Sequence, residues 1–153
     1  MKEYFLKFFS YTDWANKRVL DCLSQQQVDD EKILTLAGHI LAAQSIWLAR
    51  MTNASDSPYK LWHHYSLAEL ANMTTEVSVG YKKYLGALSN VGEMLSYKNM
   101  AGVGYQNAIE DILIHVGNHG TYHRGQIALL LREKEYEPVS TDYIVYERSF
   151  RTI

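Results

Sequence analysis

The sequence predicts an all-α protein, a four-helix bundle with crossover connections, built from a single domain over residues 1–153. Four long segments carry apolar residues at the three- and four-residue spacing of an amphipathic helix. The chain has only two prolines, and both fall in expected loops, so neither interrupts these segments. A chain of 153 residues is also long enough to bury one full hydrophobic core.

The first two helices are expected over residues 2–26 and 30–52. The first carries aromatic and aliphatic residues at helical spacing, from Phe5 to Leu23. In the second, Asp29 or Asp30 is placed to cap the first turn. Residues 53–59, which include Pro58, form a loop that separates the second helix from the third.

The third helix is expected over residues 66–89, because Ser66 and Glu69 have the spacing of a capping box. Residues 90–104 hold three glycines, and short apolar–polar alternations surround Tyr97 and Tyr105, which indicates a loop with room for a small hairpin. The loops on either side of the third helix are longer than most helix–helix turns, so at least one is expected to cross the bundle.

The fourth helix is expected over residues 106–134, ahead of Pro138. The tail over residues 139–153 is rich in tyrosine and lacks helical periodicity, so we expect no helix there.

Composition excludes several classes of protein. The chain is 47% hydrophobic and 21% charged with a net charge of −2, and it has no cluster of lysine and arginine, so a nucleic-acid partner is not expected. Charges at Glu3, Lys7 and Asp13 break the first apolar run, which favours an amphipathic helix over a signal peptide. No apolar run is expected to span a membrane. Cys22 is the only cysteine, which fits a reducing cytoplasm.

Half of the six histidines lie in His115-Val-Gly-Asn-His119-Gly-Thr-Tyr-His123. Side chains four residues apart share one face of a helix, roughly 5–6 Å apart at Cβ, so His119 and His123 can reach one metal ion. His115 and His123 are about 12 Å apart along the axis, so His115 is expected at the surface or beside a ligand. Helical phase puts His123 inside the apolar face, and Gln126 lies one turn beyond the pair as a hydrogen-bonder. The same spacing also suits two histidines that bond locally at the edge of a core.

His39 is the strongest candidate for a third ligand. Its helical neighbours are apolar: Leu36, Ala43 and Ile46. A buried histidine among such neighbours needs a partner, which either a metal ion or a backbone carbonyl would provide. His63 and His64 fall in the loop before the third helix and are expected at the surface or at the rim of a pocket.

Four motifs in order along the chain resemble the DinB family, the small metal-binding four-helix-bundle proteins of DinB/YfiT type. Tyr11-Thr-Asp-Trp14-Ala-Asn16 resembles the family motif in its first helix, and His39 followed eight residues later by Trp47-Leu48 resembles that in its second. The most specific likeness is His115-x-x-Asn-His119-x-x-Tyr122-His123-Arg124-Gly-Gln126. Thr141-Asp142-Tyr-Ile resembles the closing segment.

This resemblance implies a left-handed bundle with crossover connections, usually a homodimer. It implies three histidine ligands, which map onto His39, His119 and His123. Imidazole suits several divalent ions, and we expect zinc first and nickel second. Relatives in the wider superfamily include thiol-dependent transferases and isomerases, and the fold transfers more securely than the reaction.

The expected chemistry divides into three possibilities. One is transfer of a low-molecular-weight thiol to a small-molecule electrophile, and another is metal-dependent hydrolysis. No glutamate adjoins His119 or His123 as in a His-Glu-x-x-His protease, which favours thiol chemistry. The third is a non-catalytic, stress-associated metal-binding bundle.

The sequence also gives an expected role or position in the fold for six other residues. Tyr11 and Tyr122 are expected to be structural or to donate protons, and Trp14 and Trp47 to lie in the core. Asn16 is expected either to face the site or to bond the next loop, and Arg124 to pair with a carboxylate or lie at a dimer interface.

Overall fold

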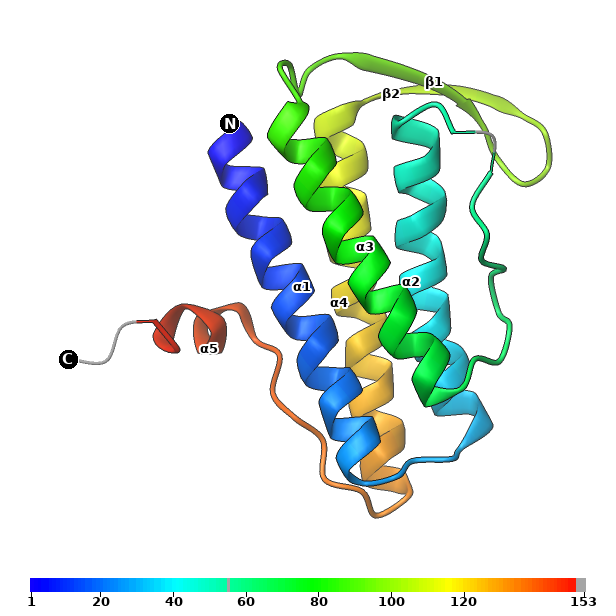
Figure 1. Ribbon diagram of the computed structural model, residues 1–153, viewed down its shortest axis with the longest axis vertical. Helices are drawn as coiled ribbons and strands as arrows, with labels where there is room; N and C mark the ends of the chain where they lie inside the picture. The colour runs from blue at the N-terminus through cyan, green and yellow to red at the C-terminus, as the bar shows by residue number, and fades with distance from the viewer. Residues whose placement is uncertain (55, 151–153) are drawn as a thin grey trace.

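The computed structural model describes residues 1–54 and 56–150, and its frame is a four-helix bundle (Figure 1). The elements follow one another as α1 (Lys2–Gln25), α2 (Glu31–Met51), α3 (Leu67–Ala87), β1 (Met94–Lys98), β2 (Gly104–Ala108), α4 (Ile109–Glu133) and α5 (Tyr143–Arg148). The expected all-α bundle is therefore confirmed, with a two-stranded hairpin added between α3 and α4.

Two pairs of helices that are adjacent in sequence, α1 with α2 and α3 with α4, lie diagonally across the bundle, whereas α2 and α3 pack side by side. The main contacts join α1 to α3, α2 to α4 and α2 to α3, with a smaller contact between α1 and α4. The connection from α2 to α3, described over residues 52–54 and 56–66, returns along the bundle, so α2 and α3 point the same way (Figure 1). This is the expected crossover. The connection from α3 to α4 instead stays at one end, where it forms the hairpin.

Side-chain caps fix the starts of two helices. The Asp30 carboxylate accepts a hydrogen bond from the Ile33 N–H at 3.0 Å, so Asp30 caps α2. Ser66 and Glu69 form the expected capping box at α3, each side chain accepting from the other's backbone N–H. These caps satisfy N–H groups that a helix start otherwise leaves without partners.

Two expectations are corrected. Residues 106–108 belong to β2 rather than to the fourth helix, because they pair with β1 in a register that places Tyr97 opposite Tyr105. The tail, expected to lack a helix, forms α5, whose six residues are too few to show a helical period. Residues 151–153 of the expected domain and tail lie outside the described residues.

α2 also departs from the expectation that no segment is apolar enough to span a membrane. Its 21 residues reach that length and composition, but 61% of the apolar window is buried inside the protein. It lies between α3 and α4 as the core helix of the bundle, and this position accounts for its apolar character.

The core consists of two large apolar clusters with polar side chains between them along the helices, and a small third cluster of Tyr11, Ala15 and Tyr146 joins α1 to α5. One large cluster includes Leu23 and Leu131, and the other includes Phe5 and Leu113. The buried polar residues at middle height are Thr12 and Asn16 of α1, His39 and Gln44 of α2, Thr74 and Ser78 of α3, and His123 and Arg124 of α4. This polar level is where the candidate site lies.

Candidate metal centre

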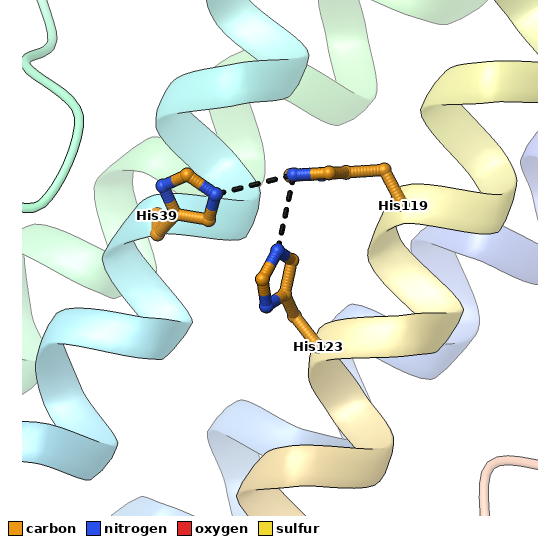
Figure 2. A group of neighbouring side chains, drawn as sticks. All are labelled: His39, His119 and His123. Carbon is orange, nitrogen blue, oxygen red and sulfur yellow. Dashed lines mark hydrogen bonds between the residues drawn. The ribbon is translucent and has the colours of Figure 1, made fainter.

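Three histidine rings meet between α2 and α4 (Figure 2). His39 comes from α2, and His119 and His123 come from consecutive turns of α4. The Nε2 atom of His119 lies 3.1 Å from the Nε2 atoms of both His39 and His123. The structure therefore brings together the three residues expected as ligands.

The arrangement fits a metal ion. Two ligand nitrogens at 2.0–2.1 Å from a tetrahedral ion are separated by roughly 3.3 Å, close to the observed 3.1 Å. The Nδ1–H of His123 donates to Gln126 Oε1 at 2.6 Å, which leaves the lone pair of His123 Nε2 facing the other two rings. This bond confirms Gln126 as a hydrogen-bonder one turn beyond the pair.

Hydrogen bonds alone do not satisfy this cluster. A neutral imidazole has one N–H, so the Nε2 of His119 cannot donate to both neighbours at once. An ion would accept all three lone pairs. No aspartate, glutamate or cysteine joins the group among the described residues, so imidazole nitrogens are the ligand atoms that it offers.

Burial disfavours the charged form of two of these rings. It lowers the pKa of His39 from 6.5 to about 4, and the neighbouring His123 contributes in the same direction. The pKa of His119 is lowered to about 4 for the same first reason, with further contributions from His123, His39 and His115. Both rings are therefore neutral at pH 7, the form that binds a metal.

We expect the metal-free protein to lose stability as the pH falls from 7 to 5. The unfolded chain takes up protons below pH 6.5, whereas the folded rings stay neutral until about pH 4, so their stabilising contribution is present above 6.5 and lost below it. One such ring lowers the free energy of unfolding by on the order of 2 kcal/mol between pH 7 and pH 5. Urea unfolding with chelator present measures it. His39→Gln should lose less between the two pH values, and an equal loss in both proteins would contradict the assignment.

The other histidines are not part of this group of three. His115 is exposed, and its ring packs beside those of Trp47 and His119, with centroids 5.5 Å and 5.7 Å away, as expected for a residue at the surface or beside a ligand. His63 and His64 are also exposed, as expected. Trp47 and Trp14 are only half-buried, at the edges of the apolar clusters.

Arg124 corrects one expectation. It is buried, and its guanidinium donates to Asn16 Oδ1 and Thr121 Oγ1, each at 3.0 Å, rather than to a carboxylate. Gly120 makes room for it, because a Cβ there would lie 2.9 Å from Arg124 Nη1. Arg124 is thus held by hydrogen bonds within the chain, and only 2% of it is exposed.

Asn16 and the two tyrosines are also placed by hydrogen bonds and exposure. The Asn16 amide donates to Gln44 Oε1 and accepts from Arg124, each at 3.0 Å, so within the described part of the chain its side-chain bonds go to these two residues rather than to the site or the next loop. Tyr11 is structural, since its buried hydroxyl donates to the Thr141 carbonyl at 2.8 Å. Tyr122 is 66% exposed beside His123 and is therefore not a core residue.

Sequence reasoning missed Trp62. It lies in the connection between α2 and α3, and its ring stacks on that of His39 with centroids 3.7 Å apart. The adjacency of Trp62 to His63 and His64 is the only signal in the sequence, and it does not indicate His39, 23 positions earlier.

Comparisons with known proteins agree with this fold. The DinB family profile matches residues 1–151. Protein DinB of Bacillus subtilis (strain 168) is 23% identical over 163 aligned positions, covering 95% of each chain. The crystal structure of a DinB-like protein from Bacillus cereus ATCC 10987 has a TM-score of 0.68 at 19% identity and covers 90% of this chain and 95% of its own. With a match over nearly its whole length, the chain belongs to the DinB family.

Proposed function

We propose that this protein binds one divalent metal ion through His39, His119 and His123 and uses it as an enzyme acting with a small thiol, in the manner of a thiol S-transferase. One observation carries the proposal: three imidazole nitrogens converge with no carboxylate among the described residues of the group. Neutral ligands leave the charge of the ion uncompensated, and such an ion holds a thiolate at neutral pH.

Zinc is the ion we propose first, and nickel second. Three imidazoles suit zinc, and two of the Nε2 separations match tetrahedral ligands. Imidazole also suits nickel, so the ligand type does not distinguish the two.

An open groove provides a route for a small molecule. It has a volume of about 960 Å³ and adjoins the centre through His123 and Trp62. Gln126 and Tyr122 line the same wall, and Leu36 and Leu130 supply apolar surface. Mixed apolar and polar walls of this kind are typical of small-molecule sites.

In the proposed transfer, the thiolate sulfur forms a bond to an electrophilic carbon of the substrate. The leaving group departs with the bonding electrons, and the thiol proton is lost to solvent. The chain's own residues hold the ion, and Gln126 keeps the Nε2 lone pair of His123 directed at it. Hydrolysis would need a general base, and the histidine cluster includes no carboxylate among the described residues.

We expect cobalt-loaded protein to develop a thiolate-to-metal charge-transfer band when a small thiol is added. The anion is the ligand, so binding depresses the thiol pKa and the band should weaken as pH falls. Absorption titration with cysteine and glutathione measures it. His119→Ala should abolish the band, and His115→Ala, one turn away and exposed, should keep it.

Other spectral responses of the cobalt-loaded protein would favour a different function. A spectral change with carboxylates or hydroxide, but with no thiol, would favour the hydrolase. No change with any of these ligands would favour a non-catalytic metal-binding bundle.

We propose a homodimer in the cytoplasm. Large apolar side chains are exposed on α1, α4 and the tail: Tyr4, Tyr122, Leu129, Ile144 and Phe150. Sedimentation at micromolar concentration should give twice the chain mass of 17.6 kDa, because burying such side chains favours association. A mass near 17.6 kDa would contradict the dimer.

The proposed compartment, the cytoplasm, rests on Cys22. Its thiol is buried and free, which supports a reducing compartment.

A further inference from the structure

Trp62 covers one face of a candidate ligand. Its ring lies on the His39 imidazole at a centroid distance of 3.7 Å and an angle of 18°, so the two rings are stacked. It also meets His123 edge-on, with centroids 6.0 Å apart. Trp62 is nevertheless 60% exposed, so burying its own side chain contributes little to the stability of the fold.

His39 lacks the hydrogen bond that usually orients a metal-binding histidine. Such a histidine almost always donates its second ring N–H to a carboxylate, a carbonyl or water. His123 has this bond, to Gln126. The Nδ1 of His39 is buried and has no hydrogen-bond partner among the described residues. Among the ring contacts of His39, the stacked indole has the shortest centroid distance, 3.7 Å, against 4.7 Å to His123 and 5.0 Å to His119.

The loop around Trp62 is held against α2 directly beside His39. The Tyr65 hydroxyl accepts from the Lys60 N–H at 2.8 Å and donates to the Lys60 carbonyl at 3.2 Å, which closes the segment on itself. The Tyr65 ring lies where Gly38 has no side chain, since a Cβ there would come within 2.6 Å of Tyr65 Cδ2. Gly38 precedes His39, so the contact that docks the loop also sets Trp62 over that ring.

The backbone of Trp62 supports a specific role. Its φ is 56°, in the left-handed region that bulky aromatic residues rarely adopt. Strained conformations of this kind persist where the surroundings fix them, and they cluster at functional sites. The left-handed turn at Trp62 places its indole on His39 while leaving the other side exposed at the groove.

We propose that Trp62 is a positioning residue of the three-histidine centre. It holds the His39 ring in its binding orientation by stacking, in place of the missing hydrogen bond, and so raises the affinity for the metal. The inference rests on the proposed metal site and assigns to it a residue from the crossover connection.

Competition against a chelator, with zinc as the probe, measures the effect on affinity. Trp62→Leu keeps apolar bulk but removes the flat ring, and we expect it to bind zinc about 10-fold more weakly, as when an orienting partner is lost. Trp62→Phe keeps an aromatic face and should restore affinity to within about threefold. Trp47→Phe is the matched control, because Trp47 packs on His115, which is not a ligand candidate.

A second readout separates positioning from folding. In metal-free protein, NMR should show the His39 ring protons shifted upfield by the indole, and Trp62→Leu should remove this shift. The metal-free melting temperature should change by no more than about 2 °C, since Trp62 is mostly exposed.

The outcomes distinguish this inference from the proposed function. Wild-type zinc affinity in Trp62→Leu, or His39 ring protons at ordinary positions in the wild type, would overturn the role of Trp62 alone. A wild-type protein that binds no divalent ion would overturn the metal site and the role of Trp62 together. Weaker binding in Trp62→Leu, with rescue by Trp62→Phe, supports both.

Discussion

Replacing His119 by alanine is expected to reduce zinc affinity by more than about 100-fold. His119 is the central member of the cluster, because its Nε2 lies 3.1 Å from both other Nε2 atoms. Losing a group that only orients a ligand costs about 10–100-fold, and losing a ligand should cost more. Elemental analysis after dialysis and chelator competition measure the change. His39→Ala and His123→Ala should behave in the same way.

His115→Ala is the matched control for this prediction. His115 lies one turn before His119 on α4, with ring centroids 5.7 Å apart, but it is exposed, packs on Trp47 and is not a member of the three-histidine group. Its metal content and affinity should stay near those of the wild type. Full metal occupancy in His39→Ala would refute the three-ligand site, and a large loss in His115→Ala would extend it.

The largest effect on folding is expected at Leu113. This side chain is fully buried in the apolar cluster near the hairpin end, to which all four long helices contribute. Leu113→Ala removes buried surface and leaves a cavity, which should cost about 3 kcal/mol of unfolding free energy. Urea unfolding of the metal-free protein measures the loss.

Ile114 provides the control for Leu113, since the next residue along α4 is 43% exposed. Ile114→Ala should change the unfolding free energy by less than about 0.5 kcal/mol. Leu113→Ala should still bind one ion per folded chain, because Leu113 lies about two turns from His119 on α4. Similar losses in the two variants would contradict the placement of α4 in the bundle.

The fourth helix shows why the sequence predicted so much of the site. Apolar residues at helical spacing set the face that α4 buries, and the same phase puts His123 inside it and His115 outside. His123 is 7% exposed, whereas His115 is exposed, as that phase requires. His39 could be identified because one polar residue among apolar helical neighbours needs a partner.

Contacts between residues far apart in the chain could not be predicted from the sequence pattern. The stack of Trp62 on His39 depends on how the crossover connection docks on α2, and no local spacing encodes it. Arg124 was misplaced because helical phase shows where a side chain starts, whereas its long stem carries the guanidinium to Asn16 on α1. The sequence pattern did not predict α5, because six residues are too few to show the helical spacing of apolar side chains.

Anomalous diffraction from crystals of the zinc-loaded protein tests the metal centre most directly. The account predicts one peak per chain between α2 and α4, about 2.0–2.1 Å from the Nε2 atoms of His39, His119 and His123. A peak held by only the two α4 histidines with His39 turned away, or no peak at the cluster in zinc-saturated crystals, would contradict it.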